Sequence, residues 1–282
     1  MKTEIVNNEA IVSFCCVRYE QAVNISEVKG ATMKNVDPVF RAMGFCYPEC
    51  HIRTPSAPDR SRACFRAKKI LEGIVYDTVF LEGNPFTFPE VKTLLEGITV
   101  GGHKLSDERQ VLNQAKSWKI LFRMIQSGEF TVSREIFCRL QGIVAEEEAL
   151  DWGNFRSGAV SIAGTGHIPP EPDDLDALFH QGVAILEKIQ SPHLRGMLFF
   201  LFGSLHQFFW DGNKRTSRLM MNGILLSSGY DVINIPAKKK LEFNEKMIRF
   251  YDNHDGAEMI QFLVSCSLDM ELTIDQNKIA VS

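Results

Sequence analysis

The chain has 282 residues, of which 45% are hydrophobic and 23% are charged, and its formal net charge is −4. This composition is typical of a globular protein, and it argues against nucleic acid as a main partner because nucleic-acid-binding proteins usually carry a basic surplus. No apolar run approaches the roughly 18 residues that span a bilayer. Residues 1–9 also lack the apolar core of a signal peptide, so we expect a cytoplasmic protein without membrane contact.

The seven cysteines are odd in number and scattered, which favours reduced thiols over a disulfide framework. Cys46, Cys50, His51 and Cys64 have the residue types of a zinc site, but their spacing is irregular and a second close pair is missing. We therefore interpret these four residues as ordinary thiols and an ordinary histidine.

Residues 1–62 are expected to form a small N-terminal extension that covers the core. Residues 10–17 could form a strand and residues 39–43 a short helical turn, while prolines interrupt the remainder. Residues 53–60 are expected to be a linker. The pattern leaves open whether the extension also contributes to a partner surface.

A long helix is predicted from Ser61 to Leu81, because apolar residues recur there at helical spacing. The sequence Glu82-Gly83-Asn84-Pro85 follows, and glycine followed by proline ends a helix. A negative charge at a helix C-terminus is unfavourable by itself. Glu82 is therefore expected to have a cationic partner.

The next stretch predicts three further helices. Thr87 and Glu90 form a capping box at the start of the first. An apolar stripe indicates a helix over residues 106–126, and a similar pattern follows over residues 133–146. The acidic run at residues 146–148 is interpreted as a solvated helix face.

Residues 153–170 interrupt the helical pattern. The alternation of Val160 and Ile162, followed by the Gly-Thr-Gly turn at residues 164–166 and a proline pair, predicts a β-hairpin. The edge of such a hairpin is suited to accept an extended peptide segment.

The remaining pattern is helical again. Asp173 and Asp174 are expected to cap a helix that runs to about Gln190, and Pro192 opens an apolar helix that ends near His206. Further helices are predicted over the ranges 213–228, 241–251 and 257–270. The chain is therefore expected to have a mainly α fold of eight or nine helices with one hairpin.

The chemistry is concentrated where the helix at residues 213–228 begins. Unpaired N–H groups at a helix start carry a partial positive charge and bind anions. Gly212 lets an anion approach the backbone, and Asn213 tolerates the tight turn. Lys214, Arg215 and Arg218 add charge, with the two arginines on one face. These residues predict a polyphosphate site.

The stretch from His206 to Arg218 resembles the signature of the Fic/Doc family, His-x-Phe-x-(Asp/Glu)-Gly-Asn-(Gly/Lys)-Arg-x-x-Arg. The family has four steps from the histidine to the acid, whereas His206 and Asp211 are five apart. We expect a loop that is one residue longer, with His206 active. In the other register Gln207 would take the place of the histidine, and glutamine cannot take a proton.

A second resemblance lies upstream. Thr78 and Glu82 match the family's inhibitory motif, (Ser/Thr)-x-x-x-Glu-(Gly/Asn), in the position found in the subgroup whose inhibitory helix lies on the N-terminal side. The resemblance implies a Fic-like domain over residues 63–282, which includes an inhibitory helix at residues 63–83.

The resemblance implies a Fic-type helical bundle that acts as a protein adenylyltransferase, which moves AMP from ATP to a Tyr, Ser or Thr hydroxyl of another protein with the help of Mg²⁺. His206 would be the general base and Asp211 the Mg²⁺ ligand. Arg215 would hold the polyphosphate and Arg218 its γ-phosphate, unless Glu82 pairs with Arg218 and leaves ATP in an unproductive pose. The other nucleotide-binding residues would be Gly212, Asn213 and Lys214.

The resemblance also implies that the predicted hairpin is a flap over the active site. In the family, this flap aligns the backbone of the target protein as an added strand. The residues that would dock the target are Val160, Ser161, Ile162 and Ala163. Family members often self-associate, and a homodimer is consistent with this reading.

Three alternatives stay open. Lys214 stands where Doc-like phosphotransferases carry lysine and adenylylating members carry glycine, so the γ-phosphate could be transferred instead. A hydrolase that removes AMP would use Glu82 to place water. An inactive nucleotide-binding module would result if the extra loop residue misplaces His206.

Overall fold

The structure, a computed structural model, describes residues 38–48, 50–53, 57–267 and 271–274. This part of the chain is mainly helical, as predicted, with eleven α-helices, two short 3-10 helices and one two-stranded sheet. None of the described helices is both long enough and apolar enough to cross a membrane. The strand predicted at residues 10–17 lies outside the described residues.

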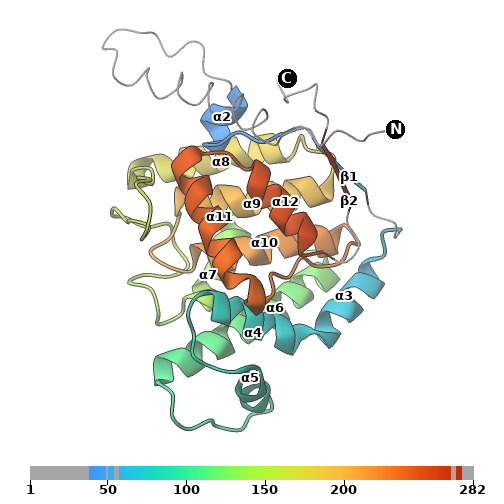
Figure 1. The fold of residues 1–282 in the computed structure, drawn as a ribbon, viewed down its shortest axis with the longest axis vertical. Coiled ribbons are helices and arrows are strands. Elements are labelled where there is room, and N and C mark those ends of the chain that lie inside the picture. The colour runs from blue at the N-terminus through green and yellow to red at the C-terminus, as the bar shows by residue number, and fades with distance from the viewer. Residues whose placement is uncertain (1–37, 49, 54–56, 268–270, 275–282) are drawn as a thin grey trace, which may run out of the picture.

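Two helices form the centre of the fold (Figure 1): α9, Pro192–His206, and α10, Asn213–Ser227. α9 is apolar on nearly all sides, and from His193 onward every residue except Arg195 is buried. It packs closely on α10, since a Cβ at Gly203 would come within 2.2 Å of the Ser217 hydroxyl. A helix that is hydrophobic all round is stable only inside a protein, which explains its central place.

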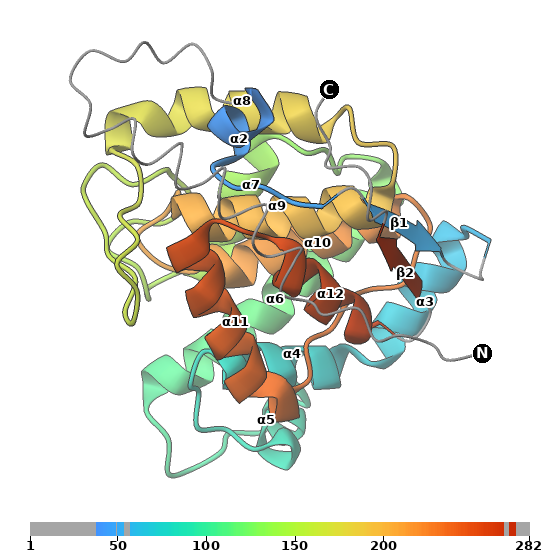
Figure 2. The ribbon, with the colours of Figure 1, turned by 45° about the horizontal axis from the view of Figure 1, so that its top comes forward.

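The other helices surround this pair (Figures 1 and 2). They are α2 Pro38–Met43, α3 Arg60–Lys69, α4 Leu71–Leu81, α5 Phe88–Leu95, α6 Leu105–Ser127, α7 Arg134–Val144, α8 Leu175–Leu186, α11 Lys240–Asn253 and α12 Ala257–Ser265, with 3-10 turns η2 Pro172–Asp174 and η3 Ala237–Lys239. Many of their apolar side chains join those of α9 and α10 in one core.

The helix predicted from Ser61 to Leu81 is divided in two. Ile70 leaves helical geometry at φ −106° and ψ 14°, and its N–H bonds to the carbonyl of Ala67 rather than one residue further back. α4 then ends at Leu81, with Glu82 as its C-cap. The division therefore leaves Glu82 at the end of the shorter helix α4.

Several predicted helix ends are confirmed. The Glu90 carboxylate accepts hydrogen bonds from the backbone N–H and hydroxyl of Thr87, at 2.8 and 2.7 Å. Ser133 caps α7. The predicted cap at Asp174 is different, because residues 172–174 form a 3-10 turn in which Asp174 makes no side-chain cap.

The β-hairpin predicted at residues 153–170 is not present. This loop contains no strand. Its backbone groups find other partners. The buried guanidinium of Arg156 donates to the carbonyls of Gly158 and Pro170, at 2.7 and 2.5 Å, and so joins the two sides of the loop. The predicted turn does form, with Gly164 at φ +87°, and the Gly166 N–H donates to Asp252.

The N-terminal extension folds over the C-terminal half. β1, Cys50–Arg53, pairs antiparallel with β2, Glu271–Ile274, so that Cys50 faces Ile274. Residues 43–46, which begin with the last residue of α2, cross the end of α9, and we name them the covering segment. The N–H of Cys46 donates to His254 at 3.0 Å, and its carbonyl accepts from Gly256 at 2.9 Å. Neither strand was predicted, since each has only four residues.

Candidate functional site

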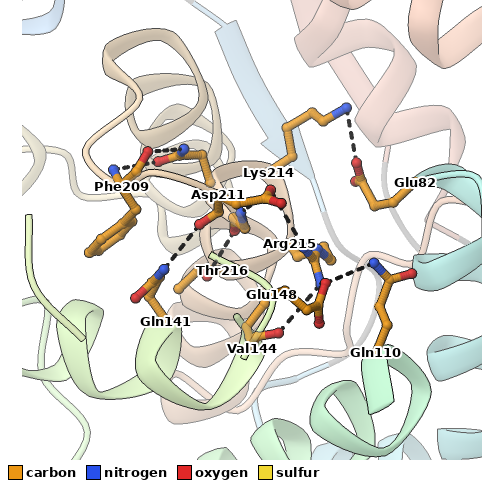
Figure 3. Close-up of polar contacts among 12 residues, drawn as sticks. Glu82, Gln110, Gln141, Val144, Glu148, Phe209, Asp211, Lys214, Arg215 and Thr216 are labelled. Carbon is orange, nitrogen blue, oxygen red and sulfur yellow. Dashed lines mark hydrogen bonds and ion pairs between the residues drawn. The ribbon is translucent and has the colours of Figure 1, made fainter. Parts of the chain in front are cut away.

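The turn between α9 and α10 is held by Asn213. Its carboxamide accepts from the Phe209 N–H at 2.9 Å and donates to the Phe209 carbonyl at 2.7 Å, which closes the loop on itself (Figure 3). Gly212 is the N-cap of α10 and has φ +77°, a left-handed conformation that favours glycine. The predicted helix start is therefore in place, and Asn213 acts as a loop-closing residue.

A cavity of about 240 Å³ opens in front of this helix start. We call it the site cavity. It is lined by Glu82, residues 161–163, Gln207, residues 210–215 and Tyr251. The structure thus brings together the predicted acid, helix start and flap residues, which lie far apart in the sequence.

Glu82 meets two of the three cations of α10 that were predicted to bind an anion. Its carboxylate contacts Lys214 Nζ at 3.1 Å and Arg218 Nη2 at 2.9 Å; Figure 3 shows the Lys214 contact. The predicted cationic partner of Glu82 is therefore present. Glu82 lines the site cavity, whereas Arg218 is only 5% exposed and lines a small internal cavity with Thr78. Glu82 thus separates Arg218 from the site cavity.

The charges around Glu82 fix its protonation state. Burial by itself raises the pKa of this carboxyl, but Lys214 and then Arg218 outweigh burial and lower it to about 2. Arg218 depends on the pair in turn, because its Nε and Nη1 have no hydrogen-bond partner among the described residues. Glu82 is consequently ionised throughout the physiological range.

The Glu82→Gln variant is expected to lose stability in a pH-dependent way. A folded pKa near 2, against about 4.5 unfolded, stabilises the wild type above pH 4.5, and this stabilisation is lost as the pH falls toward 2. The shift corresponds to about 3 kcal/mol at most. Urea unfolding from pH 7 down to pH 3 should show the difference between wild type and variant shrinking as the pH falls. A difference that stays constant with pH would contradict the pairing.

Arg215 is held by Glu148, one of the three acids that were predicted to lie on a solvated helix face. Its guanidinium, 4% exposed, contacts Glu148 at 2.9 Å. The Glu148 carboxylate also accepts from Gln110 at 2.9 Å (Figure 3). The interpretation of residues 146–148 was therefore wrong for Glu148, which is largely buried. A run of three acids gives no sign of which one turns inward.

Asp211 lies at the mouth of the site cavity with a side chain that is 58% exposed. Its carboxylate accepts from the Gly212 N–H and approaches Arg215 Nη2 at 3.5 Å. The described residues contain no group of three or more His, Cys, Asp or Glu side chains placed to hold a metal. A metal here would have one carboxylate from the protein, which suits Mg²⁺ bound mainly through phosphates.

His206 is not brought to the site cavity. The ring is 4% exposed and packs on Phe202 and Phe208 at centroid distances of 4.8 and 5.7 Å. Its Nε2 lies 3.0 Å from the carbonyl of Met43 in the covering segment, so this nitrogen carries the hydrogen, while Nδ1 has no partner among the described residues. Burial lowers the pKa of His206 to about 3, and the ring is neutral.

Gln207, and not His206, lines the site cavity at the end of α9. It ends α9 in the left-handed conformation, with φ +48°. Its side chain donates to the Ser204 carbonyl at 2.6 Å and accepts from Asn213 at 3.0 Å. α9 continues through His206. The additional residue between His206 and Asp211 therefore leaves His206 within the helix and not in the loop. The expected longer loop therefore does not place His206 at the cavity.

Two further residues of the site carry no motif. Arg156 Nε donates to the carbonyl of Gln207 at 2.6 Å, so the loop at residues 153–170 is tied to the end of α9. Tyr251, from the last turn of α11, lines the site cavity.

Of the predicted docking residues, Ser161, Ile162 and Ala163 line the cavity, and Val160 is not among its lining residues. The remaining inhibitory residue, Thr78, faces the core.

Curated proteins of known name resemble most of this chain. A protein adenylyltransferase Fic from Drosophila ananassae is 27% identical over 225 residues, which are 77% of this chain and 44% of that protein. The protein of the same name from Drosophila mojavensis is 26% identical over 207 residues, 71% of this chain and 40% of that protein. The chain therefore spans less than half the length of these relatives.

Solved structures share the fold. A fragment of Fic-1 from C. elegans aligns with a TM-score of 0.61 at 17% identity, over 90% of this chain and 70% of that one. A Fic domain containing signaling protein from Bacteroides thetaiotaomicron aligns with a TM-score of 0.56 at 22% identity, over 68% and 75%. A family model for Fic/DOC matches residues 131–225, which include α9, the loop and most of α10. Over residues 131–225 the chain is therefore similar to the Fic/DOC family.

Proposed function

We propose that the site cavity binds the polyphosphate of ATP and that the protein transfers AMP to a Tyr, Ser or Thr hydroxyl of a target protein once Glu82 has left. The observation that carries the proposal is the double contact of Glu82 with Lys214 and Arg218. A carboxylate already occupies the place where a phosphate would find two cations and a helix start.

The resting state is autoinhibited in this proposal. Glu82 stands between the site cavity and Arg218. The γ-phosphate can reach this arginine only after the carboxylate moves. Until then Lys214 is paired with Glu82 as well, and ATP lacks the group that orients its terminal phosphate. Helices α3 and α4, followed by Glu82, would thus act as the inhibitory element.

The other roles follow from the positions of the side chains. The N–H groups at the start of α10 would stabilise charge that develops on the transferred and leaving phosphates. Asp211 would hold Mg²⁺, which supplies positive charge between the phosphates when bound. The loop residues 160–163 would dock the target, since three of them border the cavity.

The base requires a rearrangement. His206 can take the proton of the target hydroxyl only if the covering segment withdraws, because its ring lies outside the cavity and its Nε2 is bonded to Met43. With the segment withdrawn, burial would no longer lower the pKa of His206, and an imidazole whose pKa is near neutral suits a general base.

A second candidate is a nucleotide-binding module without transfer. Gln207, which lines the cavity at the end of α9, supports it because a carboxamide cannot accept a proton at neutral pH. In this case Glu82 would control only nucleotide binding, and occupancy of the site would be the signal.

Labelled ATP separates these functions. The Glu82→Gly protein is incubated with cell lysate and with ATP that is labelled at either the α- or the γ-phosphate. Adenylyl transfer predicts incorporation of the α label alone, and transfer of the γ label would identify a phosphotransferase. Nucleotide binding by calorimetry without incorporation of either label would favour the binding module. Release of AMP from a pre-labelled target by the wild-type protein, but not by Glu82→Gly, would indicate the hydrolase.

A further inference from the structure

Tyr251 is a buried polar residue that the proposed mechanism does not use. Its side chain is 3% exposed, and its hydroxyl has no hydrogen-bond partner among the described residues. An unpaired buried hydroxyl costs about 1–3 kcal/mol and is uncommon in folded proteins. The residue also lines the site cavity beside Glu82 and the start of α10.

The position of this hydroxyl is fixed by packing. The ring stacks on His167 from the loop at residues 153–170, with centroids 6.1 Å apart and planes inclined by 13°. Phe250 contacts the ring from its own helix at 5.8 Å. Rotation about the ring axis leaves the oxygen where it is. The hydroxyl therefore cannot turn away to find a partner elsewhere.

The charges that act on this hydroxyl are those of the proposed switch. Burial and then the negative charge of Glu82 raise the pKa of Tyr251 far above its ordinary value, while Arg218 opposes them. The phenol keeps its proton at neutral pH and can donate a hydrogen bond. What it lacks is an acceptor.

We propose that Tyr251 is a further ligand of the nucleotide, whose hydroxyl donates to the terminal phosphate of a nucleoside triphosphate after Glu82 has left. This inference rests on the proposed function, because it assumes that a polyphosphate replaces the Glu82 carboxylate. A phosphate oxygen between Tyr251 and Arg218 would supply the missing acceptor, and it would satisfy the unpaired nitrogens of Arg218 as well.

The proposal makes Tyr251 a specificity residue for triphosphates. Tyr251 lines the site cavity together with Glu82, whose carboxylate holds the place proposed for the γ-phosphate. It should therefore add affinity for ATP and little for AMP. A hydrogen bond to a charged group contributes about 1.5–3 kcal/mol, which is about tenfold or more in affinity.

The test compares Glu82→Gly with the double variant Glu82→Gly/Tyr251→Phe, using calorimetric titration with ATP, ADP and AMP. The double variant should bind ATP about tenfold more weakly and AMP unchanged. Its melting temperature without nucleotide should be equal or higher, because only an unpaired hydroxyl has been removed. Glu82→Gly/Tyr230→Phe is the matched control, since Tyr230 packs on His193 away from the cavity, and it should bind ATP as Glu82→Gly does.

Two other results have separate meanings. Equal ATP affinity with and without the Tyr251 hydroxyl, or an equal loss for AMP and ATP, would overturn the assignment of Tyr251 and leave the proposed function in place. Absence of ATP binding to Glu82→Gly itself would overturn the proposed function and this inference together.

Discussion

Glu82→Gly is expected to raise the incorporation of α-labelled ATP into protein at least about tenfold over the wild-type rate. The wild-type carboxylate makes two charge-assisted contacts, with Lys214 and Arg218, which a phosphate must displace. Each such contact contributes about 1.5–3 kcal/mol, and about 1.4 kcal/mol already corresponds to tenfold. Glycine removes the carboxylate and leaves no side chain in the path of the γ-phosphate. Initial rates at a fixed ATP concentration measure the effect.

A matched control is available in the same chain. Glu96 is the C-cap of α5 and precedes Gly97, as Glu82 precedes Gly83 at the end of α4, but Glu96 does not line the site cavity. Glu96→Gly should therefore keep the wild-type rate. Adding Arg218→Ala to Glu82→Gly should return the rate to the wild-type level or below. A rate that is unchanged in Glu82→Gly would remove autoinhibition from the proposal.

His206→Ala is expected to lower incorporation by about a hundredfold or more in the Glu82→Gly background, which is the usual contribution of a general base. Gln207→Ala in that background should change the rate only a few-fold, because a carboxamide cannot take up a proton and the side chain of Gln207 contacts Ser204 and Asn213. ATP affinity should be unchanged in His206→Ala, since this residue does not line the cavity. Single-turnover labelling and calorimetry separate the two effects.

The reciprocal variant decides the register. If residue 207 is the position that faces the target hydroxyl, Glu82→Gly/Gln207→His should gain activity, and His206→Ala should be without effect on it. That pair of results would contradict His206 as the base and identify the natural protein as a nucleotide-binding module. Melting temperatures of all variants show whether the contact between residue 206 and Met43 matters for stability.

Much of the site could be predicted because its chemistry is local. A glycine before a helix start, followed by cations one turn apart, predicts an anion site from backbone geometry alone. The need of a carboxylate at a helix C-terminus for a cation is also local, and the structure supplied Lys214 and Arg218 to Glu82. The mainly helical fold followed from apolar periodicity in the same way.

Other features depend on contacts between distant segments, which leave no local signal in the sequence. Glu148 turns inward because Gln110 and Arg215 meet it there. Residues 153–170 lack a hairpin because Arg156 takes the carbonyls of Gly158 and Pro170. β1 and β2 are each too short to form alone and exist only as a pair.

The helix start, its cations and their need for an anion were thus determined by the sequence itself, because they arise within one or two turns of backbone. Only the tertiary structure decided which residue at the end of α9 lies at the cavity. One residue turns a helix by about 100°, so the packing of His206 against Phe202 and Met43 places Gln207 at the cavity. That choice depends on the covering segment, some 160 residues away in the chain.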